Sequence, residues 1–308
     1  MQGPGATSSS PQATPPSTHG PAPGGPAQGL IGEPNSPWQP ATRPGEQYRT
    51  LNSVDGKHDW YQWKAPGQTQ DSFSRTYKEG GKEVHERLNG DQHKIIQHVD
   101  QAFSNAKQDG SQPLKDKDGK DLGVAVHGKL TPEQLGQLGT AVESLPPALR
   151  KHAKEVAVVD QLGKQGVRKD GQTDWTSNTL GKTDSKGKIA LDRSVFNDPK
   201  LLSETLAHEA GHGLQAEKAP NLGPEWGDRS SVSEYGKTSP GEDFAETAAY
   251  VANNWKSLEN GGHGALLRTA GEPIPGAAER GSDITHRPSA TKILQVLRAM
   301  DWQSSGQN

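Results

Sequence analysis

The first half of the chain contains two segments in which hydrophobic residues recur at helical spacing. The first segment is residues 91–108, and the same helical spacing could include one more turn before it. The second, residues 131–145, begins with Thr131 as a helix cap and Pro132 at the first helical position, and it stops at Pro146-Pro147. We expect both helices to cover a sheet. The apolar residues of the first helix are Ile95, Ile96, Val99, Ala102, Phe103 and Ala106, and those of the possible earlier turn are Val84 and Leu88. The apolar residues of the second helix are Leu135, Leu138, Val142 and Leu145.

Short runs of apolar and β-branched residues predict strands at residues 122–127, 155–160 and 188–192. In the last run Ile189 and Leu191 alternate with Lys188 and Ala190, which predicts one buried face and one exposed face. Residues 164–187 between these runs are polar and rich in turn formers, so they predict an exposed loop.

The second half of the chain is predicted to be mainly helical. Asp198 can cap a helix that has Pro199 at its first position and runs to about residue 215. Further helices are predicted for residues 240–255 and 289–300 from their apolar spacing. Together with the strands, these helices predict an α+β fold.

The N-terminal part differs in composition from the rest. Residues 1–45 consist mostly of Pro, Gly, Ser, Thr, Ala and Gln, and such a segment buries too little apolar surface to offset its chain entropy. We therefore predict that residues 1–45 are disordered, that residues 46–82 are an extended linker or partly ordered, and that residues 83–308 form the main domain. No Lys or Arg precedes Arg43 and no apolar stretch follows the start, so a standard secretory signal is not expected.

Charge and cysteine content narrow the choice of partners. The net charge is -3, with basic and acidic residues interspersed, which does not favour nucleic acid as a partner. The longest apolar runs are far shorter than the ~20 residues that span a bilayer, so no membrane segment is expected. Because the chain has no cysteine, any metal must be held by His, Asp or Glu.

The segment His208-Glu209-Ala210-Gly211-His212 lies in the helix predicted after Asp198. Residues four apart on a helix project to the same side, so both imidazoles can reach one zinc ion, while Glu209 can hold a water at the open coordination position. The alternative is a pair of surface histidines. The small residues between the histidines, and the apolar Leu201-Leu202 shortly before them, favour a zinc-binding helix.

A catalytic zinc site needs a third protein ligand and a position left for water. The extended HExxHxxGxxH pattern would place Gly and His at two later positions of the same helix, but Gln215 and Lys218 occupy them. A carboxylate further along the chain is therefore favoured as the third ligand.

Residues 233–246 read Ser-Glu-Tyr-Gly-Lys-Thr-Ser-Pro-Gly-Glu-Asp-Phe-Ala-Glu. With the HEAGH segment, this stretch resembles the zincin metallopeptidases of which the anthrax lethal factor catalytic domain is an example. The resemblance implies that Glu242 is the third zinc ligand and that Tyr235 donates a hydrogen bond to the oxyanion formed when the peptide carbonyl is attacked. It also implies that Glu246 takes the position of the family's second glutamate, which supports a histidine ligand.

The resemblance covers residues 189–254 at most. It implies a zincin-like domain with a small sheet over a metal-binding helix pair, in which the strand with Ile189, Ala190 and Leu191 is an edge strand that binds an extended peptide. The chain departs from the family in a shorter connection between the two motifs and in Asp243, where the family has an apolar residue. Asp243 is therefore an alternative third ligand.

Each of these residues also has a structural explanation. Ser239 and Glu242 fit a capping box, in which Glu242 folds back on the helix cap. Glu246 is one turn from Glu242 and suits a solvated acidic face as well as a partner for a ligating imidazole. Tyr235 can be an ordinary loop tyrosine, with His263 as a weaker candidate donor.

The expected function is that of a zinc metalloendopeptidase with one Zn²⁺ per chain, acting on a protein or peptide substrate, with Glu209 as general base and Tyr235 stabilising the oxyanion. The alternatives are a non-catalytic zinc-containing binding protein and a fragment of a multidomain toxin in which residues before Lys115 form a binding module. The resemblance and the N-terminal composition suggest an exported bacterial effector or toxin, secreted without a standard signal peptide; a cytoplasmic location stays open.

Overall fold

The computed structural model describes residues 35–51, 59–68, 72–88, 90–162, 165–167, 173–175, 179–184, 186–226, 231, 233, 235–260, 263–268, 270 and 288–301. Residues 1–34, most of the segment predicted to be disordered, lie outside this set. The chain divides into two compact units, residues 1–97 and 98–308. No helix in the described part is both long and apolar enough to cross a membrane.

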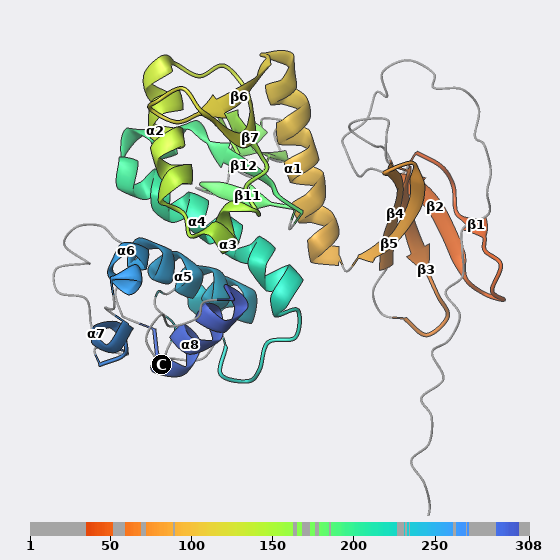
Figure 1. Ribbon diagram of the computed structural model, residues 1–308. Helices are drawn as coiled ribbons and strands as arrows, with labels where there is room; N and C mark the ends of the chain where they lie inside the picture. The colour runs from red at the N-terminus through yellow and green to blue at the C-terminus, as the bar shows by residue number, and fades with distance from the viewer. Residues whose placement is uncertain are drawn as a thin grey trace, which may run out of the picture. The chain divides into compact units, whose positions relative to one another are not determined.

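The first unit contains a five-stranded antiparallel sheet in which each strand pairs with the next one along the chain (Figure 1). Its strands are β1 (Gln39–Pro40), β2 (Gln47–Leu51), β3 (Asp59–Lys64), β4 (Ser72–Glu79) and β5 (Lys82–Leu88). A small hydrophobic core of Leu51, Trp60, Leu88 and Ile96 stabilises it.

The sequence predicts an extended linker or a partly ordered segment for residues 46–82, and the described residues of this range contain β2, β3 and β4. Val84 and Leu88, which fitted a helical turn, lie in β5, and the predicted domain start at residue 83 falls within the β4–β5 hairpin. The alternation of apolar and polar residues that would predict these strands is weak, because polar residues occupy much of the sheet. Arg75, for example, is buried in β4, where its guanidinium contacts the Glu86 carboxylate at 2.7 Å.

The second unit is built on a mixed five-stranded sheet with the order β11-β12-β8-β7-β6. Its strands are β6 (Ser111–Lys115), β7 (Asp121–His127), β8 (Glu155–Val159), β11 (Gly181–Thr183) and β12 (Lys188–Asp192). The three inner strands are parallel and both outer pairs are antiparallel. The three predicted strands are confirmed as β7, β8 and β12. The predicted loop is wrong in part, since it contains β11 and the hairpin of β9 (Gln165–Val167) and β10 (Thr173–Trp175).

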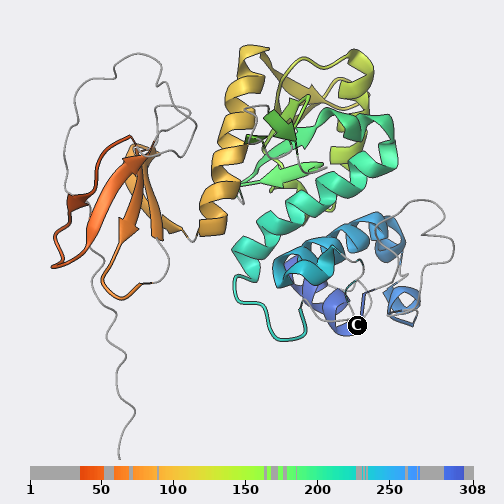
Figure 2. The same cartoon turned by 180° about the vertical axis from the view of Figure 1, so that it is seen from behind.

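Helices cover both faces of this sheet (Figures 1 and 2). The second-unit part of α1 (Gly90–Gln108) packs on Ala157 and Ala190, whereas α2 (Pro132–Ser144) and α4 (Pro199–Lys218) pack on the opposite face through Val156 and Ile189. Ala190, predicted to be exposed, is therefore completely buried. The α+β fold and the sheet-covering role of the predicted helices are confirmed.

The helix caps follow the sequence prediction closely. Thr131 and Gln134 form a reciprocal capping box at the start of α2, and Asp198 accepts a hydrogen bond from the Lys200 amide at 2.8 Å at the start of α4. The remaining helical segments are α3 (Pro147–Arg150), η1 (Arg193–Asn197), η2 (Gly236–Thr238), α5 (Pro240–Asn253), α6 (Trp255–Glu259), α7 (His263–Arg268) and α8 (Ala290–Ala299). The helices predicted at residues 240–255 and 289–300 are thus confirmed as α5 and α8, with small shifts at their ends.

Candidate metal centre

The segment His208–His212 lies in the middle of α4, and the apolar face of this helix fixes its position. Leu202, Leu206, Ala210 and Leu214 follow one another at four-residue spacing, and each is at most 1% exposed within the main core. Complete burial of each of the three leucines contributes about 1.5–3 kcal/mol. Because this face is held in the core, the orientation of His208 and His212 on the helix is also fixed.

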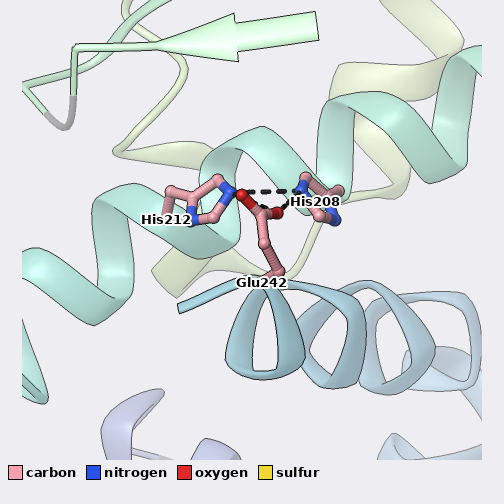
Figure 3. Close-up of side chains that lie close together, drawn as sticks. All are labelled: His208, His212 and Glu242. Atoms are coloured by element: carbon pink, nitrogen blue, oxygen red, sulfur yellow. Dashed lines mark hydrogen bonds and ion pairs between the residues drawn. The ribbon is translucent and has the colours of Figure 1, made fainter. Parts of the chain in front are cut away.

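Small residues bring α5 close to α4. A Cβ added at Gly211 would lie 3.0 Å from the Ala248 Cβ and 3.1 Å from the Ala245 Cα. Such a close approach of two helix backbones needs a glycine on one side and alanines on the other. It places the first turn of α5, with Glu242, beside the two histidines of α4 (Figure 3).

Three ligand atoms converge at this point. The Glu242 Oε2 atom lies 3.1 Å from His208 Nε2 and 3.2 Å from His212 Nε2, and the two Nε2 atoms are 3.1 Å apart (Figure 3). Among the described residues, these side chains form a group that could hold a metal ion. This confirms that His208, His212 and Glu242 meet at one site.

The spacing of the three atoms fits a small tetrahedral cation. Ligands about 2.0–2.1 Å from zinc at tetrahedral angles are about 3.3 Å from one another, close to the observed separations. The donor set of two imidazole nitrogens and one carboxylate oxygen is also one that zinc accepts. When the histidines are neutral and carry their proton on Nδ1, both Nε2 atoms are acceptors like the carboxylate oxygen, so a cation among the three atoms relieves their mutual repulsion.

The electrostatics of the three groups are strongly coupled. Burial alone would lower the pKa of His208, but hydrogen bonds to the Glu242 and Glu246 carboxylates outweigh it and raise this pKa to about 10. Burial opposes the charge on Glu242, yet the two imidazoles hold the pKa of its carboxyl well below the usual range. The site therefore stabilises positive charge between the carboxylates, whether it is carried by a proton or by a metal ion.

The structure also distinguishes between Glu242 and Asp243 as the third member of the site, and between the capping and ligand roles of Glu242. Ser239 Oγ accepts a hydrogen bond from the Glu242 amide at 3.2 Å, so one half of the predicted capping box forms. The Glu242 carboxylate nevertheless turns towards the histidines. Asp243 is completely buried, and its Oδ2 atom lies 2.8 Å from the Lys292 ammonium instead of in the ligand group. Asp243 is therefore not the third member of the site.

Glu246 supports His208 from the other side of its ring. Its Oε1 atom lies 3.1 Å from His208 Nδ1, and the residue is only 8% exposed. A carboxylate at Nδ1 fixes the ring orientation and leaves Nε2 to face the centre of the site. Glu246 is thus a buried partner of His208 and not part of a solvated acidic face.

Glu209 lies under the sheet beside the ligand group. It is 5% exposed, and burial raises the pKa of its carboxyl. A Cβ built at Gly181 of β11 would lie only 2.7 Å from the Glu209 Oε1 atom, so the strand backbone passes directly over this carboxylate. Gly181 was not singled out by the sequence, because nothing in a lone glycine indicates what lies beneath it.

Tyr235 lies immediately before η2 and beside His208. Its ring centroid is 5.9 Å from that of His208, and the residue is 52% exposed. Partial burial and the negative charge of Glu242 raise the pKa of its phenol, which keeps the group protonated as a hydrogen-bond donor. His263, the alternative donor, is the first residue of α7, and its side chain lies outside the described residues.

The predicted substrate-binding strand requires a correction. Ile189, Ala190 and Leu191 are 0% exposed and lie in β12, which is hydrogen-bonded to β11 on one side and to β8 on the other. A strand with neighbours on both sides cannot accept a peptide strand. The last strand of this sheet on the side of the site, among the described residues, is β11.

The geometry of the site is the principal guide to function. Comparisons with models of known protein families, with curated proteins and with solved structures found nothing that matches this chain.

Proposed function

We propose that this chain is a zinc-dependent endopeptidase with a zincin-like site. The observation that carries the proposal is the meeting of His208, His212 and Glu242 at one point, with the Glu209 carboxylate buried beside it. Zinc fits the donor set and its spacing better than the hard cations magnesium and calcium, which prefer oxygen ligands.

Zinc bound by these ligands would lower the pKa of a water molecule and polarise a peptide carbonyl. Glu209 has the burial and raised pKa that suit a general base, because it can take a proton from the attacking water and later return it to the leaving amine. The Tyr235 phenol stays protonated and donates a hydrogen bond to the oxygen that becomes negative during the attack. Glu246 keeps the His208 ring in the same orientation during the reaction.

The number of protein ligands supports a catalytic role. Structural zinc sites usually close all four positions with protein side chains, whereas catalytic sites leave one for water or substrate. The ligand group within the described residues has three members. A buried carboxylate next to it adds a general base that a structural site does not need.

The substrate is proposed to lie along β11. This strand contains Gly181, whose backbone lies over Glu209, and it takes the place that the sequence had suggested for β12. A peptide paired with a strand at this position would bring its carbonyl groups close to the base and the metal ligands.

The proposal is tested by comparing the native chain with Glu209→Gln and Glu242→Ala for zinc content and for cleavage of an unstructured protein substrate. We expect Glu209→Gln to keep its zinc and lose cleavage, and Glu242→Ala to lose cleavage and to bind zinc far more weakly, through the two histidines that remain. Glu217→Gln is the matched control, because Glu217 lies on the same helix with 46% of its side chain exposed and pairs with Lys151. This control should retain full activity.

Three results would overturn the proposal. Equal cleavage by the native chain and Glu209→Gln would remove the peptidase mechanism, and zinc binding without any cleavage would leave a non-catalytic zinc protein. Full zinc retention by Glu242→Ala would show that the three side chains do not act as one metal site.

A further inference from the structure

A buried ion pair includes Asp243, the residue next to Glu242 on α5. The Lys292 ammonium on α8 is 2.8 Å from Oδ2 of Asp243 on α5, and the two side chains are 1% and 0% exposed. Burial of two charges is costly unless each is held in a fixed, well-bonded geometry. The pair therefore ties α8 to one particular position on α5.

Other contacts of α8 also hold Lys292 beside α5. The ammonium lies 5.7 Å from the centre of the Trp226 ring, and the indole Nε1 atom of Trp226 donates a hydrogen bond to Gln295 Oε1 at 2.7 Å. Trp226 also packs on Phe244, the residue after Asp243, with 5.1 Å between the ring centroids. Lys292 thus sits among groups that are themselves anchored to α5.

Asp243 is the neighbour of the metal ligand Glu242 in the first turn of α5. The end turns of a helix fray most easily, because some of their backbone groups lack partners within the helix. Successive residues on a helix are rotated by about 100°, so a bond that holds Asp243 towards α8 also sets the direction in which Glu242 leaves the helix. The turn before α5 packs here too, since a Cβ at Gly236 would lie 3.4 Å from the Asp243 Cα.

We propose that Lys292 is a positioning residue for the metal site, acting through Asp243 to hold Glu242 in line with His208 and His212. This inference rests on the proposed function, because it concerns the same zinc site. The ion pair fixes the rotation of the first turn of α5, and with it the third ligand. Residues from three separate helices are then needed for one ion.

The test is a double-mutant cycle on the full chain, with zinc affinity measured by competition with a chromophoric chelator. We expect Lys292→Met to weaken zinc binding at least tenfold in the native background and to have no further effect in Glu242→Ala, because it acts through that ligand. The absorption spectrum of the cobalt-loaded protein should shift in Lys292→Met in the same direction as in Glu242→Ala.

A control separates positioning from loss of stability. Leu114→Ala removes a core side chain from β6, at the opposite edge of the sheet from β11, and should lower the melting temperature without changing zinc affinity. If Lys292→Met does not fold, the pair Asp243→Leu with Lys292→Met replaces the ion pair by apolar side chains, and the same cycle applies. This pair should also bind zinc more weakly than the native chain.

Unchanged zinc affinity in the folded Lys292 variants would overturn the inference and leave the proposed function intact. Equal losses in the native and Glu242→Ala backgrounds would do the same, since Lys292 would then act independently of Glu242. A native chain that binds no zinc would overturn both proposals.

Discussion

Replacement of Gly181 by alanine tests whether Glu209 is the general base without touching Glu209 itself. A Cβ at this position would lie 2.7 Å from both Cγ and Oε1 of Glu209 and 2.9 Å from the Thr205 Cγ2 atom. Glu209 is buried on α4, and these contacts are relieved when its carboxylate moves away from its present position. None of these three nearest atoms belongs to His208, His212 or Glu242.

The size of the displacement follows from these distances. Ordinary contacts begin at about 3.4 Å, so the Glu209 carboxylate must shift by roughly 0.7 Å. A misplacement of about 1 Å at a catalytic group can cost up to about 100-fold in rate. We therefore expect kcat/KM to fall by about 10- to 100-fold, which corresponds to about 1.4–2.7 kcal/mol of transition-state stabilisation.

The assay measures cleavage of an unstructured substrate and zinc content for Gly181→Ala and for Gly136→Ala. Gly136 is an exposed glycine of α2 whose added Cβ would meet nothing within 4 Å, so its replacement should leave activity unchanged and raise stability by about 0.5–1 kcal/mol. Native activity in Gly181→Ala would refute the role of Glu209 as the base. A loss of zinc in the same variant would refute the expectation that the new methyl group displaces Glu209 without disturbing the zinc ligands.

Three further predictions concern the remaining parts of the site. Tyr235→Phe should lower kcat by about 100-fold with zinc content and KM unchanged, as measured by steady-state kinetics, because only the oxyanion donor is removed; a native kcat would contradict that role. Glu246→Gln should weaken zinc binding by about 10- to 100-fold in chelator competition, since the carboxylate that orients His208 becomes neutral, and undiminished affinity would show that it does not support the ligand. Gly211→Ala should destabilise the fold by about 1–3 kcal/mol in thermal unfolding, because the new methyl group meets the backbone of Ala245 on α5, and an unchanged melting temperature would show that the two helices can separate freely.

The part of the site that lies on one helix was predictable from sequence. His208 and His212 share a face because of helical periodicity alone, and the cap at Asp198 set the start of that helix. The third member was harder, since Glu242 and Asp243 are adjacent carboxylates and only tertiary contacts distinguish them. Asp243 turns to Lys292, which is 49 residues further along the chain, and no local pattern indicates such a partner.

The limits of the fold prediction have a similar physical origin. The strands β7, β8 and β12 are apolar because both faces of the sheet are covered, so they stand out in the sequence. The short β11 and the sheet of the first unit have mixed polarity, and the glycine of β11 that approaches Glu209 looks like an ordinary loop residue. Strand position within a sheet depends on pairing between distant segments, which is why β12 was mistaken for an edge strand.

The partial exposure of the three ligand side chains has a consequence for metal supply. His208, His212 and Glu242 keep 12%, 20% and 22% of their side-chain surface exposed, so an ion can reach them in the folded chain. The proposed zinc site could therefore be loaded in a chain that has already folded. The free zinc concentration of the surroundings, compared with the dissociation constant of the site, would then set the fraction of molecules that is active.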